Sequence, residues 1–260
     1  MNELHLFAGS GGGILAGRLL GHRCIGAVER EPSAQQHLLA RQRDRALEPF
    51  PIFSDIRTFD GRPYRGRADV VAGGFPCQAY SGASRGRSVA EDLWPEMRRV
   101  VADVAPRYVF AENVARKAID AAADDLQQMG YAVRCVALSA ADLGADHIRQ
   151  RYWLLAHADA HGKLRLQVDA EVAELPRIRP GVWQAEPDES RVADGMADRM
   201  DRLEATGNGQ VPIVAATAWR LLMRAHAYSK VVDSDSKVSE RYVKSSMKLA
   251  EWTEHYEKQV

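Results

Sequence analysis

The chain has little cysteine, no net charge and no long apolar run. It holds three cysteines in 260 residues without paired spacing, which indicates a reducing compartment. Lys and Arg number 35, as do Asp and Glu, so any basic surface for nucleic acid must be local. No apolar run could span a membrane, and the amino terminus enters an expected strand at once, without a signal peptide. We therefore expect a cytoplasmic protein without a membrane partner.

What the chain does have is an alternation of short apolar runs with segments of helical spacing. We expect strands near 3–7, 24–28, 69–73, 107–111, 132–138 and 152–156, with helices between them. Residues 93–104 predict an amphipathic helix that Pro106 ends. This order predicts a doubly wound, Rossmann-like α/β sheet. From about Asp159 the alternation fades into a polar segment, for which we expect loops and short irregular pieces.

Residues 73–81 carry the strongest chemical signal. One thiol, Cys77, follows Pro76 in a short glycine-bounded loop, just after an apolar run at 68–72 that is typical of a buried parallel strand. Ligands of open α/β sheets bind at the carboxyl ends of the strands, so Cys77 is a candidate nucleophile. The alternative is a small buried hydrophobe in a turn.

Residues 3–20 give a second signal, the order of strand, glycine turn and helix. Glycines let the backbone approach a ligand closely, and a helix amino terminus offers unpaired amide groups. A second apolar run ends in Glu29, whose carboxylate can accept hydrogen bonds from both ribose hydroxyls. From these residues alone, nicotinamide and methionine-derived cofactors both remain open.

Taken together and in this order, the segments from Leu6 to about Leu222 resemble the cytosine-5 DNA methyltransferase family. The resemblance implies the cofactor S-adenosylmethionine and no metal. It implies a nucleophile in Cys77, an acid in Glu112 of the Glu-Asn-Val segment, and paired arginines in Arg149 and Arg151. The implied cofactor contacts are Phe7, Ala8, Gly9, Ser10, Gly11, Gly12, Glu29, Asp55, Ile56, Pro76, Leu93 and Asn208.

The chemistry of cytosine explains why these residue types belong together. Carbon 5 is too electron-poor to attack a methyl sulfonium, so a Cys77 thiolate would first add to carbon 6. A protonated Glu112 would neutralise the charge that develops at ring nitrogen 3. Arg149 would hold the base oxygen and favour the thiolate. No residue identifies the base that removes the carbon 5 proton, and water is a candidate.

A cytosine stacked in a duplex must be flipped out before it can react. The small, basic residues 82–88 are typical of a loop that closes over DNA, although a solvated surface loop is the alternative. The expected DNA contacts are Gln78, Ser81, Ser84, Arg85 and Arg87. A target recognition region confined to 159–199 is short, which predicts a short or degenerate recognition sequence.

The resemblance also predicts the domain boundaries of the chain and its binding partners. We expect a catalytic and cofactor-binding domain at 1–158, a target recognition region at 159–199, a return to the catalytic domain at 200–224 and a charged extension at 225–260. The expected partner is double-stranded DNA, bound by a monomer in a prokaryotic or phage-infected cell. A cognate restriction endonuclease would be a functional partner rather than a physical one.

Two departures and three alternatives accompany the resemblance. His147 stands where the family usually has glutamine, and Gly209-Gln210 where small and apolar residues are usual. An RNA cytosine-5 methyltransferase and a DNA-binding relative with little turnover remain alternatives. A nicotinamide dehydrogenase would explain the glycine turn but not Cys77, Glu112 and Arg149. The segment 157–161, with two histidines and an aspartate, lacks the spacing of a zinc site.

Overall fold

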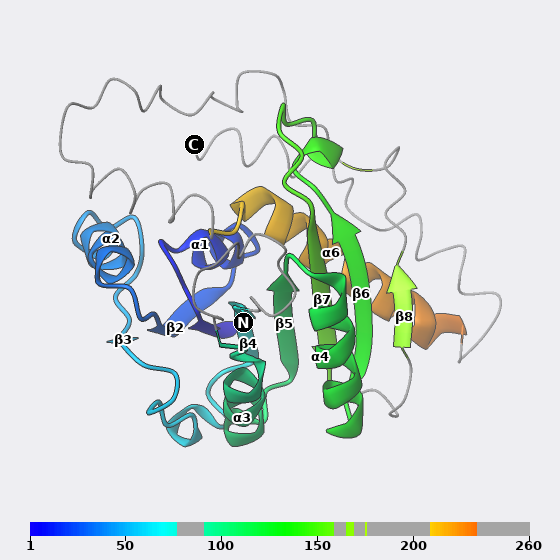
Figure 1. Ribbon diagram of the computed structural model, residues 1–260, viewed down its shortest axis with the longest axis horizontal. Helices are drawn as coiled ribbons and strands as arrows, with labels where there is room; N and C mark the ends of the chain where they lie inside the picture. Colours follow the sequence, from blue (N-terminus) through cyan, green and yellow to red (C-terminus); the bar gives the residue numbers. More distant parts are fainter. Residues whose placement is uncertain (77–90, 159–164, 169–174, 176–208, 233–260) are drawn as a thin grey trace.

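The computed structural model describes residues 1–76, 91–158, 165–168, 175 and 209–232. They form one eight-stranded sheet covered by helices on both faces (Figure 1). In chain order the elements are β1 (Asn2–Leu6), α1 (Gly12–Leu19), β2 (Arg23–Val28), α2 (Pro32–Arg43), β3 (Ile52–Phe53), the 3-10 helix η1 (Arg62–Tyr64), β4 (Val70–Gly74), α3 (Trp94–Val104), β5 (Tyr108–Asn113), α4 (Arg116–Gln128), β6 (Ala132–Leu138), the 3-10 helix η3 (Ala141–Leu143), β7 (Arg151–His157), β8 (Arg165–Val168) and α6 (Pro212–Val232).

The strands follow the order β3-β2-β1-β4-β5-β7-β6-β8 across the sheet. From β3 to β5 all neighbours pair in parallel, whereas β7 is antiparallel to both β5 and β6. Strand β8 pairs in parallel with β6 at the edge. The switch in direction at β7 brings the start of that strand to the edge where β5 ends.

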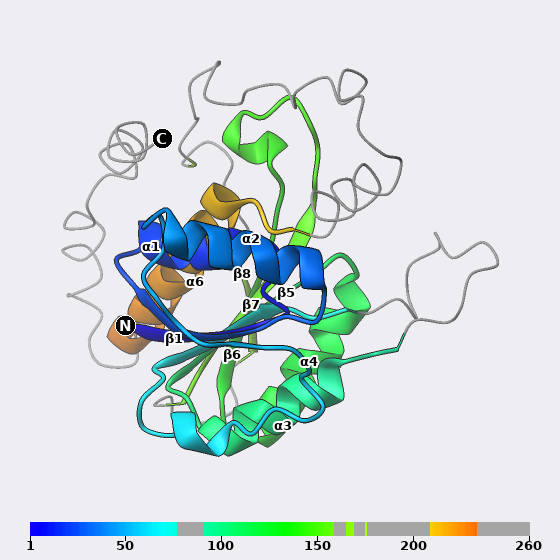
Figure 2. The same ribbon diagram turned by 90° about the vertical axis from the view of Figure 1, so that its left-hand side faces the viewer.

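Helices α3 and α4 cover one face, and α1, α2 and α6 cover the other (Figure 2). Alternate residues of one strand therefore enter two separate cores. In β4, Val71 packs in the core of α3 and α4, whereas Val70 and Ala72 pack in the core that contains Trp219 of α6. Near-continuous apolar runs are expected of such strands, because both faces are covered. The doubly wound prediction is confirmed.

The six expected strands all exist, displaced by no more than two residues at either end. Helix α3 begins at Trp94, and Ala105 adopts a left-handed conformation (φ 47°) just before Pro106. Strands β3 and β8 were not expected, and β8 adds a regular strand within the polar segment 159–199. Helix α6 continues to Val232, beyond the expected end of the catalytic part at 224.

Candidate active site

The carboxyl ends of β1, β4 and β5 meet at one edge of the sheet. Strand β1 leads into the glycine turn, β4 leads into Phe75 and Pro76, and β5 ends in Glu112 and Asn113. Arg151, the first residue of the antiparallel strand β7, reaches the same edge. The fold thus brings together the expected cofactor turn, the acid and one of the paired arginines, at the edge where open α/β sheets bind ligands.

The turn after β1 has left-handed backbone at three positions, Phe7 (φ 54°), Gly9 (φ 53°) and Gly11 (φ 96°). Glycine adopts this conformation at little cost, but a bulky residue such as Phe7 is strained by it. Such strain is concentrated at ligand-binding sites. Gly11 is also the N-cap of α1, so the first free amide groups of that helix lie at the turn.

The buried carboxylate of Glu29, just after β2, lies against this turn. One of its oxygens accepts a hydrogen bond from the amide of Gly9 at 2.6 Å, and the other accepts one from the amide of Glu31 at 2.8 Å. Each carboxylate oxygen has two lone-pair sites, so each keeps one acceptor position. The structure therefore places Glu29 beside the glycine turn, with acceptor capacity for hydroxyl groups.

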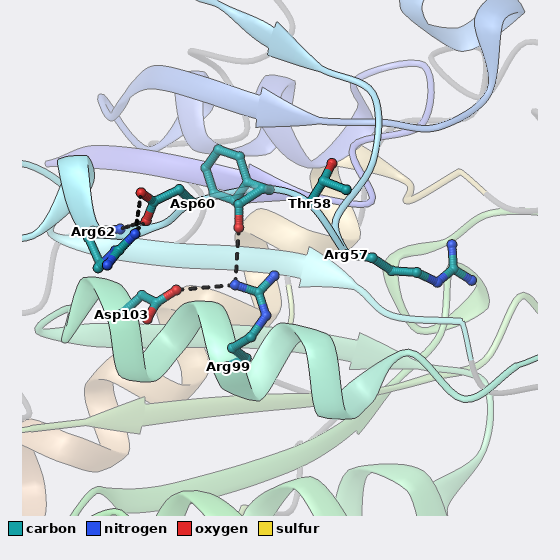
Figure 3. A pocket seen from close by; sticks show the side chains of 7 residues that line it. Arg57, Thr58, Asp60, Arg62, Arg99 and Asp103 are labelled. Carbon is teal, nitrogen blue, oxygen red and sulfur yellow. Dashed lines mark hydrogen bonds and ion pairs between the residues drawn. The ribbon is translucent and has the colours of Figure 1, made fainter.

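The segment after β3 carries Asp55 and Ile56, and α3 holds it in place. The guanidinium of Arg99 donates to the carbonyl oxygens of Ile56 at 2.6 Å and Phe59 at 3.0 Å. The same group pairs with Asp103 at 3.2 Å, beside a cavity of about 370 Å³ (Figure 3). Ile56 is buried and Asp55 is half-buried. Arg99 thus fixes the backbone that presents Asp55 and Ile56, two of the implied cofactor contacts.

Pro76 and Leu93 lie at the two ends of the segment that carries the expected nucleophile. The amide of Leu93 donates to the carbonyl of Pro76 at 3.3 Å, so the two ends lie side by side. Leu93 is the N-cap of α3 and packs against the core. Outside the described residues lie Cys77, Gln78, Ser81, Ser84, Arg85, Arg87 and Asn208.

Glu112 is a buried acid with three polar neighbours. Its Oε1 lies 3.0 Å from Nε of Arg151, and its Oε2 accepts a hydrogen bond from Nε2 of Gln210 at 3.4 Å. Gly74 of β4 leaves room for the carboxylate, because a Cβ there would lie 2.6 Å from Oε2. Burial raises the pKa of Glu112, although Arg151, Gln210 and Arg149 act in the opposite direction. A raised pKa is the property expected of a proton donor.

Asn113 connects the acid to the segment that leads to Cys77. Its buried side chain donates from Nδ2 to the carbonyl oxygen of Phe75 at 2.8 Å. Its Oδ1 accepts a hydrogen bond from the amide of Ala115 at 2.9 Å. The end of β5 and the segment after β4 are therefore held in fixed register.

The guanidinium of Arg149 donates to the carbonyl oxygen of Gly209, which ties the segment just before β7 to the residues before α6. Its expected contact, the base oxygen, would require a bound base. His147 is exposed, and its Nδ1 lies 3.4 Å from the carboxylate of Asp146. Of the two departures from the family pattern, Gln210 contacts a candidate catalytic group, Glu112.

Three residues that contact the candidate active site or the segments that build it were not among the residues expected from the sequence. Asn113 lay within the Glu-Asn-Val segment, which was a usable signal. Gln210 was noted only as a departure near the cofactor, and its contact with Glu112 spans 98 positions. Nothing in the sequence distinguishes Arg99 from the other charged residues of its amphipathic helix, so its role could not be predicted.

A comparison with protein families decides the relationship. Residues 1–243 match the family described as C-5 cytosine-specific DNA methylase. The chain belongs to this family. The match extends beyond Leu222, where the motif resemblance was expected to end.

Curated relatives include two bacterial methylases. Type II methyltransferase M.NgoMIV of Neisseria gonorrhoeae is 32% identical over 164 residues, which cover 59% of this chain and 51% of the relative. Type II methyltransferase M1.HphI of Haemophilus parahaemolyticus is 32% identical over 173 residues, covering 61% and 46%. The chain thus spans about half the length of these relatives. Among solved structures, a DNMT2 mutant of Spodoptera frugiperda shares the fold, with a TM-score of 0.55, 15% identity, and coverage of 73% of this chain and 61% of that one.

The described part of the chain contains no cluster of three or more His, Cys, Asp or Glu side chains arranged to hold a metal ion. The buried ring of His157 stacks on Tyr108, with ring centroids 4.6 Å apart, whereas Asp159 and His161 lie outside the described residues. None of the described helices is both long and apolar enough to cross a membrane.

Proposed function

We propose that this chain is a DNA (cytosine-5) methyltransferase, which transfers a methyl group from S-adenosylmethionine to carbon 5 of cytosine in duplex DNA. One observation carries the proposal. A buried acid, Glu112, is paired with Arg151 at the sheet edge that also holds the glycine turn and the segment leading to Cys77. Membership of the methylase family supports the same activity.

The residues at the glycine turn fit S-adenosylmethionine. The turn combines left-handed backbone at Gly9 and Gly11 with the amino terminus of α1, which suits a carboxylate of the ligand. Glu29 would accept hydrogen bonds from the ribose hydroxyls, and Asp55 and Ile56 would contact the adenine. When bound, this cofactor supplies a methyl group on a positively charged sulfur.

The remaining cofactor contacts that we propose are Phe7, Ala8, Ser10, Gly12, Pro76, Leu93 and Asn208. Those within the described part lie in the turn after β1, at the first residue of α1, just after β4 and just before α3. They would enclose the cofactor between the two ends of the Cys77 segment and the glycine turn.

In the reaction that we propose, the Cys77 thiolate adds to carbon 6 of the cytosine and forms a carbon–sulfur bond. The electron pair displaced from the ring moves toward nitrogen 3, which takes a proton from Glu112. Arg149 would hold the base oxygen, and Arg151 would stabilise the Glu112 carboxylate that remains.

Carbon 5, now electron-rich, would form a bond to the methyl carbon, and the electron pair of the broken methyl–sulfur bond would stay on the sulfur of the product, S-adenosylhomocysteine. Water then removes the carbon 5 proton, the carbon–sulfur bond breaks, and the Cys77 thiolate leaves with its electron pair. The proton on nitrogen 3 returns to Glu112, so the enzyme regains its starting state. The fixed register that Asn113 gives to the acid and the Cys77 segment supports this sequence of steps.

Binding of duplex DNA requires that the target base leave the helix, at a cost of about a few kcal/mol. Gln78, Ser81, Ser84, Arg85 and Arg87 would contact the DNA around the vacated position. We propose that residues 159–199 read a short or degenerate sequence, that 1–158 and 200–224 form the catalytic domain, and that 225–260 form a charged extension whose first residues continue α6. Methylation of this kind protects DNA from a cognate restriction endonuclease.

The experiment that tests the activity is transfer of labelled methyl groups to unmethylated duplex DNA and to transfer RNA, with base-resolution sequencing of the product. We expect label at carbon 5 of DNA cytosine, lost in Cys77→Ala. Cys24→Ala is the matched control, because burial raises the pKa of the Cys24 thiol to about 12 and keeps it protonated. Label on RNA alone would replace DNA by RNA as the substrate, and no label on either would indicate a binding protein.

The covalent step has its own test. In DNA that carries 5-fluorocytosine, carbon 5 has no proton to lose, so the adduct with Cys77 should persist after methyl transfer. We expect mass spectrometry to find the DNA attached to the peptide that contains Cys77. Methyl transfer without any trapped adduct would exclude the covalent route.

A further inference from the structure

Gln210 contacts both the acid, Glu112, and the glycine turn that is expected to bind the cofactor. It lies just before α6, and its Nε2 donates to Oε2 of Glu112 at 3.4 Å. Its Oε1 lies over the glycine turn, 2.5 Å from the point where Gly13 would carry a Cβ. Its backbone carbonyl packs against Gly12, where a Cβ would collide with it. One side chain therefore spans the distance between the acid and the expected cofactor turn.

This position is built by the surrounding residues. Gly13 and Gly74 leave the space that the amide occupies, since a Cβ on Gly74 would lie 3.3 Å from its Nε2. Arg149 holds the preceding carbonyl, that of Gly209. Gln210 is half-buried, as are both arginines near the acid, Arg149 and Arg151. Its amide is thus constrained from the β4 side and from the turn.

An amide can both donate a hydrogen bond to Glu112 and accept one from it, which an arginine cannot do. A guanidinium only donates hydrogen bonds, so Arg149 and Arg151, the charged groups among the described residues that act on Glu112, favour its ionised form. A glutamine amide donates through nitrogen to a carboxylate, and after rotation it accepts through oxygen from a carboxylic acid. It can therefore keep the carboxyl group in place before and after the proton moves.

We propose that Gln210 is a positioning residue, which holds the Glu112 carboxyl group against the glycine turn through both protonation states of the reaction. This inference rests on the proposed function, in which Glu112 gives a proton to the base and later recovers it. In the free enzyme the amide acts as a donor to Oε2. Its removal should therefore disturb both the place and the titration of Glu112.

The decisive variant is Gln210→Met, which keeps the length of the side chain and removes the amide. We expect the single-turnover rate of methyl transfer to duplex DNA to fall about tenfold, with the KM for DNA unchanged. The alkaline limb of its pH profile should move to higher pH by about half to one unit, because Glu112 loses a donor to its ionised form. Gln128→Met, at an exposed position in α4, is the matched control and should leave both quantities unchanged.

A second variant and a direct titration keep the test independent of activity. Gln210→Glu has the same shape but brings a second carboxyl group to Glu112, so the alkaline limb should move further in the same direction. The pKa of Glu112 itself can be followed by ¹³C NMR of labelled glutamate in the protein without DNA or cofactor, with Glu112→Gln to identify the signal. We expect the pKa of Glu112 to be higher in Gln210→Met than in the wild type.

The outcomes separate the two proposals. A slower Gln210→Met with an unmoved alkaline limb and an unmoved Glu112 titration would reduce Gln210 to a structural role and overturn the inference. So would a variant that matches Gln128→Met in every measurement. A wild-type protein that transfers no methyl group would instead overturn the proposed function, and the NMR titration would still decide whether Gln210 controls Glu112.

Discussion

Nε of Arg151 lies 3.0 Å from Oε1 of Glu112, and only 18% and 8% of these side chains are exposed. A buried carboxylate is costly, and a guanidinium this close offsets much of the cost. Burial nevertheless leaves the pKa of Glu112 above its ordinary value. The pair therefore holds the carboxyl group in place without fixing it as an anion, as a group that exchanges a proton with a base requires.

Replacement of Arg151 by methionine should make stability strongly dependent on pH. Without the guanidinium, the pKa of Glu112 in the folded state rises further above its unfolded value of about 4.3. A raised folded pKa means that the folded state binds more protons, so stability falls as pH rises between the two values. We expect Arg151→Met to cost about 3 kcal/mol at pH 8 and clearly less at pH 5, measured by urea unfolding.

The control for this experiment is Arg116→Met, which removes an exposed arginine that lies 3.7 Å from Asp120. Exposed pairs contribute about 0 to 1 kcal/mol, so this variant should change little at either pH. An equal loss at pH 5 and pH 8 in Arg151→Met would show that the arginine acts through packing alone.

Glu3 should govern stability in acid. Its buried carboxylate is paired with His5 at 2.8 Å and His22 at 2.7 Å, beneath Gly17, which has no Cβ to obstruct it. Burial alone would raise the pKa of Glu3, but the hydrogen bonds from the two histidines lower it to about 2. A lowered folded pKa gives stability that is present above about 4.3 and lost as pH falls toward about 2.

We expect Glu3→Gln to lower the free energy of unfolding at pH 7 by an amount on the order of 3 kcal/mol. The difference from wild type should shrink as the pH falls toward 3. The matched change is Glu48→Gln, at an exposed carboxylate that lies 2.8 Å from Arg23. It should leave stability nearly constant, and acid sensitivity equal to that of Glu48→Gln would contradict the role given to Glu3.

The sequence predicted the strands well because each one is a short apolar run bounded by glycine, proline or charge. It failed at β3 and β8, since a strand of two residues and a strand in a polar segment have no such pattern. The antiparallel direction of β7 was equally hidden, because periodicity does not encode direction. Glu29 could be predicted as a cofactor contact from its place at the end of a strand, whereas Glu112 was expected from the resemblance of the Glu-Asn-Val segment.

Contacts between distant segments could not be predicted. Arg99, Gln210 and Glu3 look like ordinary polar residues in the sequence, and their partners become neighbours only when the sheet and helices have packed. These contacts depend on the space left by small neighbours. A Cβ on Gly17 would collide with the carboxylate of Glu3, and one on Gly74 would collide with that of Glu112. The positions of Cys77 and the DNA contacts stay predictions, since they lie outside the described residues.

Arg99 should affect cofactor affinity without any contact to the cofactor. Its hydrogen bonds to the carbonyls of Ile56 and Phe59 fix the segment that presents Asp55. We expect Arg99→Met to weaken S-adenosylmethionine binding about tenfold by calorimetry, because the segment must then be ordered at the expense of binding free energy. The adjacent Arg98→Met should bind normally, as Arg98 only approaches Asp125 at 3.9 Å. Equal affinities of the two variants for S-adenosylmethionine would contradict this prediction.

Asn113 should set the rate of adduct formation. Its amide donates to the carbonyl of Phe75, two positions before Cys77, and a displacement of about 1 Å at a reacting group can cost about a hundredfold in rate. We expect Asn113→Ala to slow trapping by 5-fluorocytosine DNA at least tenfold while S-adenosylmethionine binding stays near normal. Asn2→Ala is the control, since the exposed amide of Asn2 donates to the carbonyl of Arg67 at 3.1 Å. If both variants trap at the wild-type rate, the register between β5 and the Cys77 segment does not limit catalysis.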